Sequence, residues 1–136
     1  MKYKNNPLNI RVGSNWFGLA GSRNGFCEFD SVAYCIRASL MILRSYSLRG
    51  IVTIGDIIRT WAPPSENNTN SYVSFVCMKV GHHSGFVVDV KRPVFMFDFL
   101  KAMCLMESSF GLSSSSFDEG YFLFLDLLNK RSFLND

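Results

Sequence analysis

Apolar residues recur every three or four positions over much of this chain, a spacing that places them on one face of a helix. The first such stretch predicts a helix from a cap at Asp30 or Ser31 to about Leu48. A second, short helix is expected from Thr53 to about Trp61, where it must end because two prolines follow. Each start carries a side chain that can accept hydrogen bonds from the backbone N–H groups that a first helical turn leaves free.

Three further helices follow along the chain. The third covers about residues 70–79, and the fourth starts at Pro93, which suits a first helical turn, and ends near Glu107. A final amphipathic helix is predicted for residues 117–130, after a four-serine linker at 113–116. The apolar positions of that last helix are Phe122, Leu125 and Leu128.

Little of the chain favours strands. The first 30 residues are rich in Asn, Gly and Ser, and they predict loop with a small hairpin and a short strand at 8–12. A second short strand fits residues 86–90. We therefore expect a mainly α fold that is α+β only by a small hairpin. One domain should span residues 1–136, with a loop and hairpin region at 1–30, a helical core at 31–110 and the C-terminal helix at 117–130.

Composition supports a folded chain and excludes several classes of function. Hydrophobic residues make up 48% and charged residues 18% of the chain, which is enough apolar material for a core. The net charge is only +3 and the basic residues are scattered, so no specific nucleic-acid binding is expected. No stretch approaches the roughly 18 apolar residues of a membrane span. Residues 1–7 hold no apolar run, so no signal peptide is expected.

The cysteines and histidines predict no metal or other cofactor. The four cysteines are far apart, in apolar settings, and are expected to be buried free thiols that fold in a reducing compartment. No zinc-type spacing is present. The adjacent His82 and His83 are interpreted as an incidental loop pair, because further ligands are lacking. The four cysteines are Cys27, Cys35, Cys77 and Cys104.

Two segments are too specific to reflect packing alone. The first is N-N-P-L-N-I-R at residues 5–11, followed by Trp16-x-Gly18, and the second is W-A-P-P-S-E-N-N-T at 61–69, followed by Tyr72. With supporting matches, they resemble the phage and prophage structural-protein family, which is similar in places to cell-wall lytic proteins. The resemblance covers about residues 4–110. The supporting matches are Phe26-x-x-Phe29, Ile36-Arg37-Ala38 and Leu43-x-x-Tyr46.

Both motifs carry groups suited to a saccharide. Asparagine, arginine and glutamate side chains can hydrogen-bond sugar hydroxyls and N-acetyl groups, and a tryptophan can stack on a sugar face. The alternatives are structural: turn formation before Pro7, helix capping by Asn68 or Thr69, and core packing by the tryptophans. The candidate substrate-binding residues are Asn6, Asn9, Arg11, Trp16, Trp61, Glu66, Asn67 and Tyr72.

Glu107 is the candidate catalytic acid. The sequence M-E-S-S-F-G at 106–111 is similar to the E-S-x-[FG] signature of lytic transglycosylases and goose-type lysozymes, in which the acid lies at a helix end and faces the saccharide cleft. A general acid needs partly apolar surroundings that raise its pKa, and Met103, Met106 and Phe110 could supply them. In those enzymes the glutamate comes early in the domain, whereas here it comes late. A surface glutamate at a helix end is the alternative.

These observations support two main hypotheses for a protein made in the bacterial cytoplasm without a signal peptide. The first is a lysozyme-like, phage-type protein that cleaves peptidoglycan glycan strands. The second is a non-catalytic virion structural or interaction protein whose loops contact other virion subunits. An effector or regulator derived from a prophage is the third. Convergence of Glu107, Glu66 and residues 6–11 on one groove would favour the enzyme.

Overall fold

The computed structural model describes residues 1–135, and the side chains of residues 1–131. Helices hold more than half of the chain, so the predicted mainly α fold with a small hairpin is confirmed. The elements in chain order are β1 (Leu19–Arg23), β2 (Phe26–Phe29), α1 (Val32–Leu48), α2 (Ile54–Trp61), α3 (Thr69–Val80), α4 (Pro93–Ser108) and α5 (Ser114–Asn135).

The helix boundaries follow the capping signals of the sequence. The Thr53 hydroxyl accepts a hydrogen bond from the Asp56 N–H at 3.2 Å and starts α2. The Asn68 side chain accepts one from the Ser71 N–H at 3.3 Å and starts α3. Gly81 ends α3 in the left-handed conformation, with φ of 75°. The predicted starts and ends of α1 to α4 are confirmed to within a residue or two.

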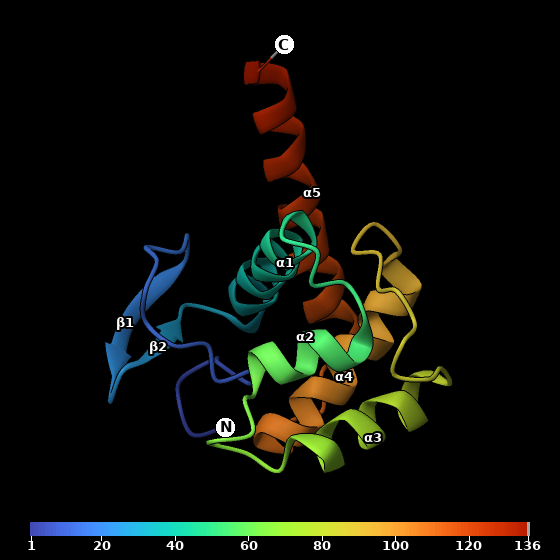
Figure 1. The fold of residues 1–136 in the computed structure, drawn as a ribbon. Coiled ribbons are helices and arrows are strands. Elements are labelled where there is room, and N and C mark those ends of the chain that lie inside the picture. Colours follow the sequence, from blue (N-terminus) through green and yellow to red (C-terminus); the bar gives the residue numbers. More distant parts are fainter. Residues whose placement is uncertain (136) are drawn as a thin grey trace.

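The helices enclose one core, and the hairpin lies to one side of them (Figure 1). Helix α1 packs most extensively along α5, while α3 packs against both α4 and α2. The β1–β2 pair is antiparallel, and the loop before it is tied to β2. No helix in the described part of the chain is long and apolar enough to cross a membrane. The largest fully buried side chains include Leu8, Phe29, Ile36, Leu40, Ile58, Phe99, Phe117 and Phe124.

The predicted strand at residues 8–12 is wrong. This segment is a loop whose one ladder contact is an isolated bridge between Arg11 and Phe26. Asn9 takes a positive φ of 52°, which interrupts an extended chain. The hairpin forms further along, where Asn24 and Gly25, both with positive φ, make the turn between β1 and β2.

The predicted strand at residues 86–90 is also wrong. Only an isolated bridge between Val87 and Thr53 forms there. The chain turns immediately afterwards, because the Asp89 side chain accepts a hydrogen bond from the Lys91 N–H at 2.9 Å. Residues 86–88 therefore form one short extended piece that pairs with the chain at the start of α2.

The start and the orientation of α5 differ from the prediction. The serines at 114–116 are the first helical turn, and the Ser113 hydroxyl caps it by accepting from the Ser116 N–H at 3.2 Å. The buried face consists of Phe117, Tyr121 and Phe124, whereas Phe122 and Leu125 are exposed. Gly120 explains this register, since a Cβ atom there would lie 2.6 Å from Ile36 Cβ. This close approach turns the face that contains Gly120 toward α1.

Candidate functional site

The loop at residues 5–11 is shaped by the buried side chain of Asn6. Its amide donates to the carbonyls of Ile10 at 3.0 Å and Cys27 at 2.8 Å, and it accepts from the Ile10 N–H at 2.9 Å. The residue is fully buried. Asn6 therefore builds the loop, and the expectation that it lines a groove is not met.

The last turn of α4 holds the same loop through Glu107 and Ser108. Asn9 Nδ2 donates to Glu107 Oε1 at 3.0 Å and to the Glu107 carbonyl at 3.1 Å. The Ser108 hydroxyl donates to the Pro7 carbonyl at 2.8 Å. Both residues of the Glu-Ser pair thus dock residues 7–9 onto the end of α4.

A third segment contributes Tyr72, which lies in α3. Its hydroxyl donates to Glu107 Oε2 at 3.0 Å, so each carboxylate oxygen accepts a hydrogen bond from a side chain. Tyr72 is buried and does not line the groove described below. We call Asn9, Tyr72 and Glu107 the carboxylate cluster.

The charge state of the carboxylate cluster is set mainly by burial. Burial raises the pKa of the Glu107 carboxyl, and the hydrogen bonds from Asn9 and Tyr72 and the charge of Arg11 oppose this shift. Burial and the nearby carboxylate raise the pKa of Tyr72 well above its usual value, so its phenol stays a donor. The raised pKa of Glu107 is the direction expected for a general acid.

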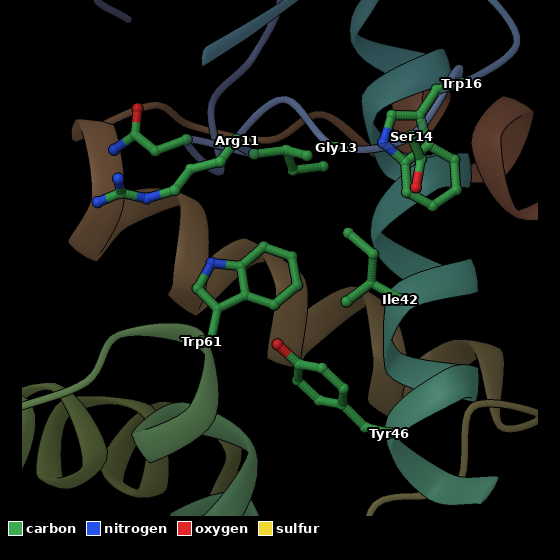
Figure 2. Close-up of a pocket in the computed structure, with 9 residues that line it drawn as sticks. Arg11, Gly13, Ser14, Trp16, Ile42, Tyr46 and Trp61 are labelled. Atoms are coloured by element: carbon green, nitrogen blue, oxygen red, sulfur yellow. The ribbon is translucent and has the colours of Figure 1, made fainter. Parts of the chain in front are cut away.

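Four of the predicted site residues meet in one groove of about 290 Å³ (Figure 2). The Trp61 indole N–H donates to the Leu8 carbonyl at 3.3 Å, and its ring lies edge-on to Tyr46 with centroids 6.4 Å apart. In Figure 2 the Tyr46 hydroxyl points toward the Trp61 ring. The groove is lined by Asn9, Ile10, Arg11, Gly13, Ser14, Trp16, Ile42, Tyr46 and Trp61.

Arg11 lies between the groove and the loop that follows α2. Its guanidinium lies over the Phe26 ring at 5.0 Å and pairs with Glu66 at 3.1 Å. Glu66 does not line the groove, and Asn67 donates to the Pro63 carbonyl at 3.4 Å. The Trp-Pro-Pro loop therefore contributes Trp61 directly and Glu66 only through Arg11.

Glu107 lines a second hollow, of about 390 Å³. Asn9 lines both this hollow and the groove. The candidate residues Asn9, Arg11, Trp16 and Trp61 therefore line the groove, whereas Glu107 lines the second hollow and does not converge with them on one groove. The other residues of the hollow are Lys2, Tyr3, Phe26 and Ser108.

Several lining residues carry no local signal of function. In the sequence, Ile42 and Tyr46 have the spacing of ordinary residues on a helix face, and Tyr3 precedes the motif at residues 5–11. Only the supporting match at Leu43-x-x-Tyr46 pointed to one of them. Their role depends on where α1 passes the N-terminal loop, which no short motif encodes.

The cysteines and histidines pack or form hydrogen bonds within the fold. All four cysteines are free; Cys27, Cys35 and Cys104 are buried, as predicted, whereas Cys77 is only partly buried. His82 stacks on Phe86 with ring centroids 3.7 Å apart, and His83 accepts from the Gly85 N–H at 3.1 Å. Within residues 1–135, no group of three or more His, Cys, Asp or Glu could hold a metal ion.

Comparison with known proteins places this chain beside a phage protein. Over 84 residues it is 42% identical to Protein P5 of Pseudoalteromonas phage PM2. The aligned region covers 57% of this chain and 52% of P5, so it spans about half the length of that relative. No protein-family model matches the chain. The chain is thus similar to a phage protein, as the resemblance at residues 4–110 led us to expect.

Proposed function

We propose that this protein is a phage virion protein that acts through contacts with other virion subunits rather than by catalysis. The observation that carries the proposal is the 42% identity to a phage protein over 84 residues. The carboxylate cluster supports it, because both Glu107 side-chain oxygens already accept internal hydrogen bonds, one from Asn9 of the N-terminal loop and one from Tyr72 of α3. In this function the groove at Trp16 and Trp61 receives a segment of a neighbouring subunit.

Purified particles test this proposal. The phage or induced prophage that carries the gene is grown, and particles are banded on a density gradient and analysed by quantitative mass spectrometry. We expect the protein to band with the particles at a constant ratio to the capsid proteins. A gene-deletion lysate mixed with the purified protein controls for adhesion. Recovery only in the soluble lysate would count against the virion function.

A second candidate function is cleavage of peptidoglycan glycan strands, as a lytic transglycosylase does. The observation that favours it is a half-buried Glu107, with a raised pKa, facing a hollow that adjoins the groove of aromatic side chains. Glu107 would protonate the glycosidic oxygen, and the substrate's own hydroxyl would complete the displacement. Asn9 and Tyr72 would hold the carboxyl in place, while Arg11, Trp16 and Trp61 would contact the sugars.

Release of soluble muropeptides from purified sacculi tests the second function. Replacing Glu107 with Gln keeps its size but removes the transferable proton, so release should fall by a factor on the order of hundreds or more. Glu119→Gln is the matched control, because Glu119 is exposed on α5 and lines neither depression. If the wild type releases nothing from several sacculus types, the catalytic function is excluded. Equal release by wild type and Glu107→Gln would remove Glu107 from the mechanism.

A further inference from the structure

The groove at Trp16 and Trp61 is aromatic at its centre. Both tryptophans of the chain line it, and Tyr46 is a third aromatic side chain there. The three come from the loop before β1, from the last turn of α2 and from α1 (Figure 2). Each is only partly buried, so ring surface stays accessible. At about 290 Å³ the groove is small for a ligand pocket and suits a short extended segment.

The charges at this groove are positive. Arg11 lines it with a side chain that is 63% exposed, and the exposed Arg49 lies over the Tyr46 ring at 5.3 Å. Among the described residues that line the groove, none is acidic. Arg49 forms no ion pair with any side chain of residues 1–131. The groove therefore favours a ligand with negative charge.

The same bias extends over the segments that build the groove. Residues 1–55, which contain the N-terminal loop and α1, hold seven basic and only two acidic residues. Residues 56–136 hold seven basic and nine acidic residues. The small net charge of the chain thus conceals a basic N-terminal part, and all but one of the residues that line the groove belong to it.

Glu66 shows which anion suits the Arg11 end. Its carboxylate contacts the Arg11 guanidinium at 3.1 Å, and both side chains are at least half exposed. An ion pair this exposed is weak and exchanges with solvent, so a carboxylate of another molecule can replace Glu66. A guanidinium can also hold a carboxylate through two parallel N–H groups. One end of the groove is therefore already complementary to a carboxylate.

An acidic peptide matches this arrangement better than a glycan or a nucleic acid. Sugar hydroxyls are neutral and would leave both guanidinium groups without an anionic partner. A nucleic acid carries a phosphate at every nucleotide, whereas the centre of the groove is aromatic. A peptide can place an apolar residue on the rings and carboxylates at the ends. Proline suits the apolar place, because proline-rich segments are already extended and dock into aromatic grooves.

We propose that the groove binds an extended, acidic peptide segment of another virion subunit, with a proline-containing apolar centre between carboxylate side chains. The apolar centre contacts Trp16, Tyr46 and Trp61, and the carboxylates meet Arg11 and Arg49. This inference rests on the proposed function, in which a neighbouring subunit enters the groove, and adds the chemical class of the segment that enters.

Tryptophan fluorescence reports on this groove alone, because both tryptophans of the chain line it. The purified full-length protein is titrated with the synthetic peptide Asp-Glu-Pro-Leu-Pro-Glu-Asp. We expect the tryptophan emission to shift and saturate, and the affinity to fall as salt is added. The neutral peptide Asn-Gln-Pro-Leu-Pro-Gln-Asn should bind about fivefold more weakly or worse, because it lacks the carboxylates.

Substitutions in and around the groove sharpen the test. Trp16→Ala should weaken binding of the acidic peptide about tenfold or more, as loss of a central aromatic contact does. Arg49→Gln should weaken it about two- to fivefold, and Glu66→Gln should strengthen it by a similar factor because it frees Arg11. Arg92→Gln is the matched control, since Arg92 is exposed before α4 and does not line the groove. Thermal melts verify that each variant folds.

Three results would overturn this inference. The first is tryptophan emission that stays unchanged up to about 1 mM acidic peptide, which corresponds to a negligible affinity. The second is equal binding of the acidic and neutral peptides. The third is tighter binding of an N-acetylglucosamine oligomer or of oligothymidylate under the same conditions.

The two proposals fail separately. A protein that bands with virus particles but binds no acidic peptide overturns only the peptide inference. One that binds the acidic peptide but is absent from the particles overturns only the virion function.

Discussion

The N-terminal loop is held by two kinds of polar contact that differ in burial. Asn6 and the carboxylate cluster satisfy backbone and side-chain groups that are wholly or partly enclosed. The Arg11–Glu66 ion pair joins two side chains that are each at least half exposed. A buried polar group that loses its partner has no water to replace it, whereas an exposed ion pair exchanges freely with solvent. The comparison predicts a steep ranking of substitutions along one short loop.

The largest effect is expected for Asn6→Ala. This change leaves the carbonyls of Ile10 and Cys27 and the Ile10 N–H without their side-chain partner, so the free energy of unfolding should fall by about 3 kcal/mol or more. Urea denaturation measures it. Asn67→Ala, at an exposed loop position, is the control and should stay within about 0.5 kcal/mol of the wild type. Similar losses for both variants would contradict the ranking.

The next effect is expected for Tyr72→Phe. It removes the buried hydroxyl that donates to Glu107 and should lower the free energy of unfolding at neutral pH by about 1–2 kcal/mol. A double-mutant cycle isolates the contact, because the loss should shrink when Glu107 is already Gln. Additive losses in that cycle would show that the hydroxyl contributes through something other than Glu107.

A pH effect should follow from the burial of Glu107. Its pKa is higher in the folded chain than in the unfolded chain, so the folded chain keeps this proton after the unfolded chain has lost it. The wild type should therefore lose stability relative to Glu107→Gln as pH rises from the unfolded-state pKa, about 4.3, to the raised folded value. Above that window the difference in free energy of unfolding between the wild type and Glu107→Gln should be constant. Paired chemical denaturation from pH 4 to 8 measures the slope, and a flat or rising difference would contradict this origin of the shift.

The smallest effect is expected for Glu66→Gln. The exposed partner of Arg11 should contribute at most about 0.5 kcal/mol to the free energy of unfolding, and less at high salt. Denaturation at low and high ionic strength measures it. A loss comparable to that of Tyr72→Phe would show that the ion pair is protected from solvent, and would reverse the comparison between the two contacts.

The helix boundaries could be predicted directly from the sequence. Thr53 and Asn68 start helices by accepting hydrogen bonds from nearby backbone N–H groups, Gly81 ends α3 in the left-handed conformation, and Pro93 suits a first helical turn, so α2, α3 and α4 begin or end where predicted. The buried face of α1 also follows its own spacing. The mainly α fold was therefore determined by patterns that need no distant partner.

Only the tertiary structure decided which side chains face the core and which face the depressions. Asn6 and Asn9 belong to one motif, yet one is buried by β2 and the other reaches Glu107, 98 residues away. The close packing of Gly120 against Ile36 turned Phe122 and Leu125 outward, although their spacing alone predicted a core face. Contacts between distant segments depend on how whole helices pack, and the spacing within any one segment does not contain that information.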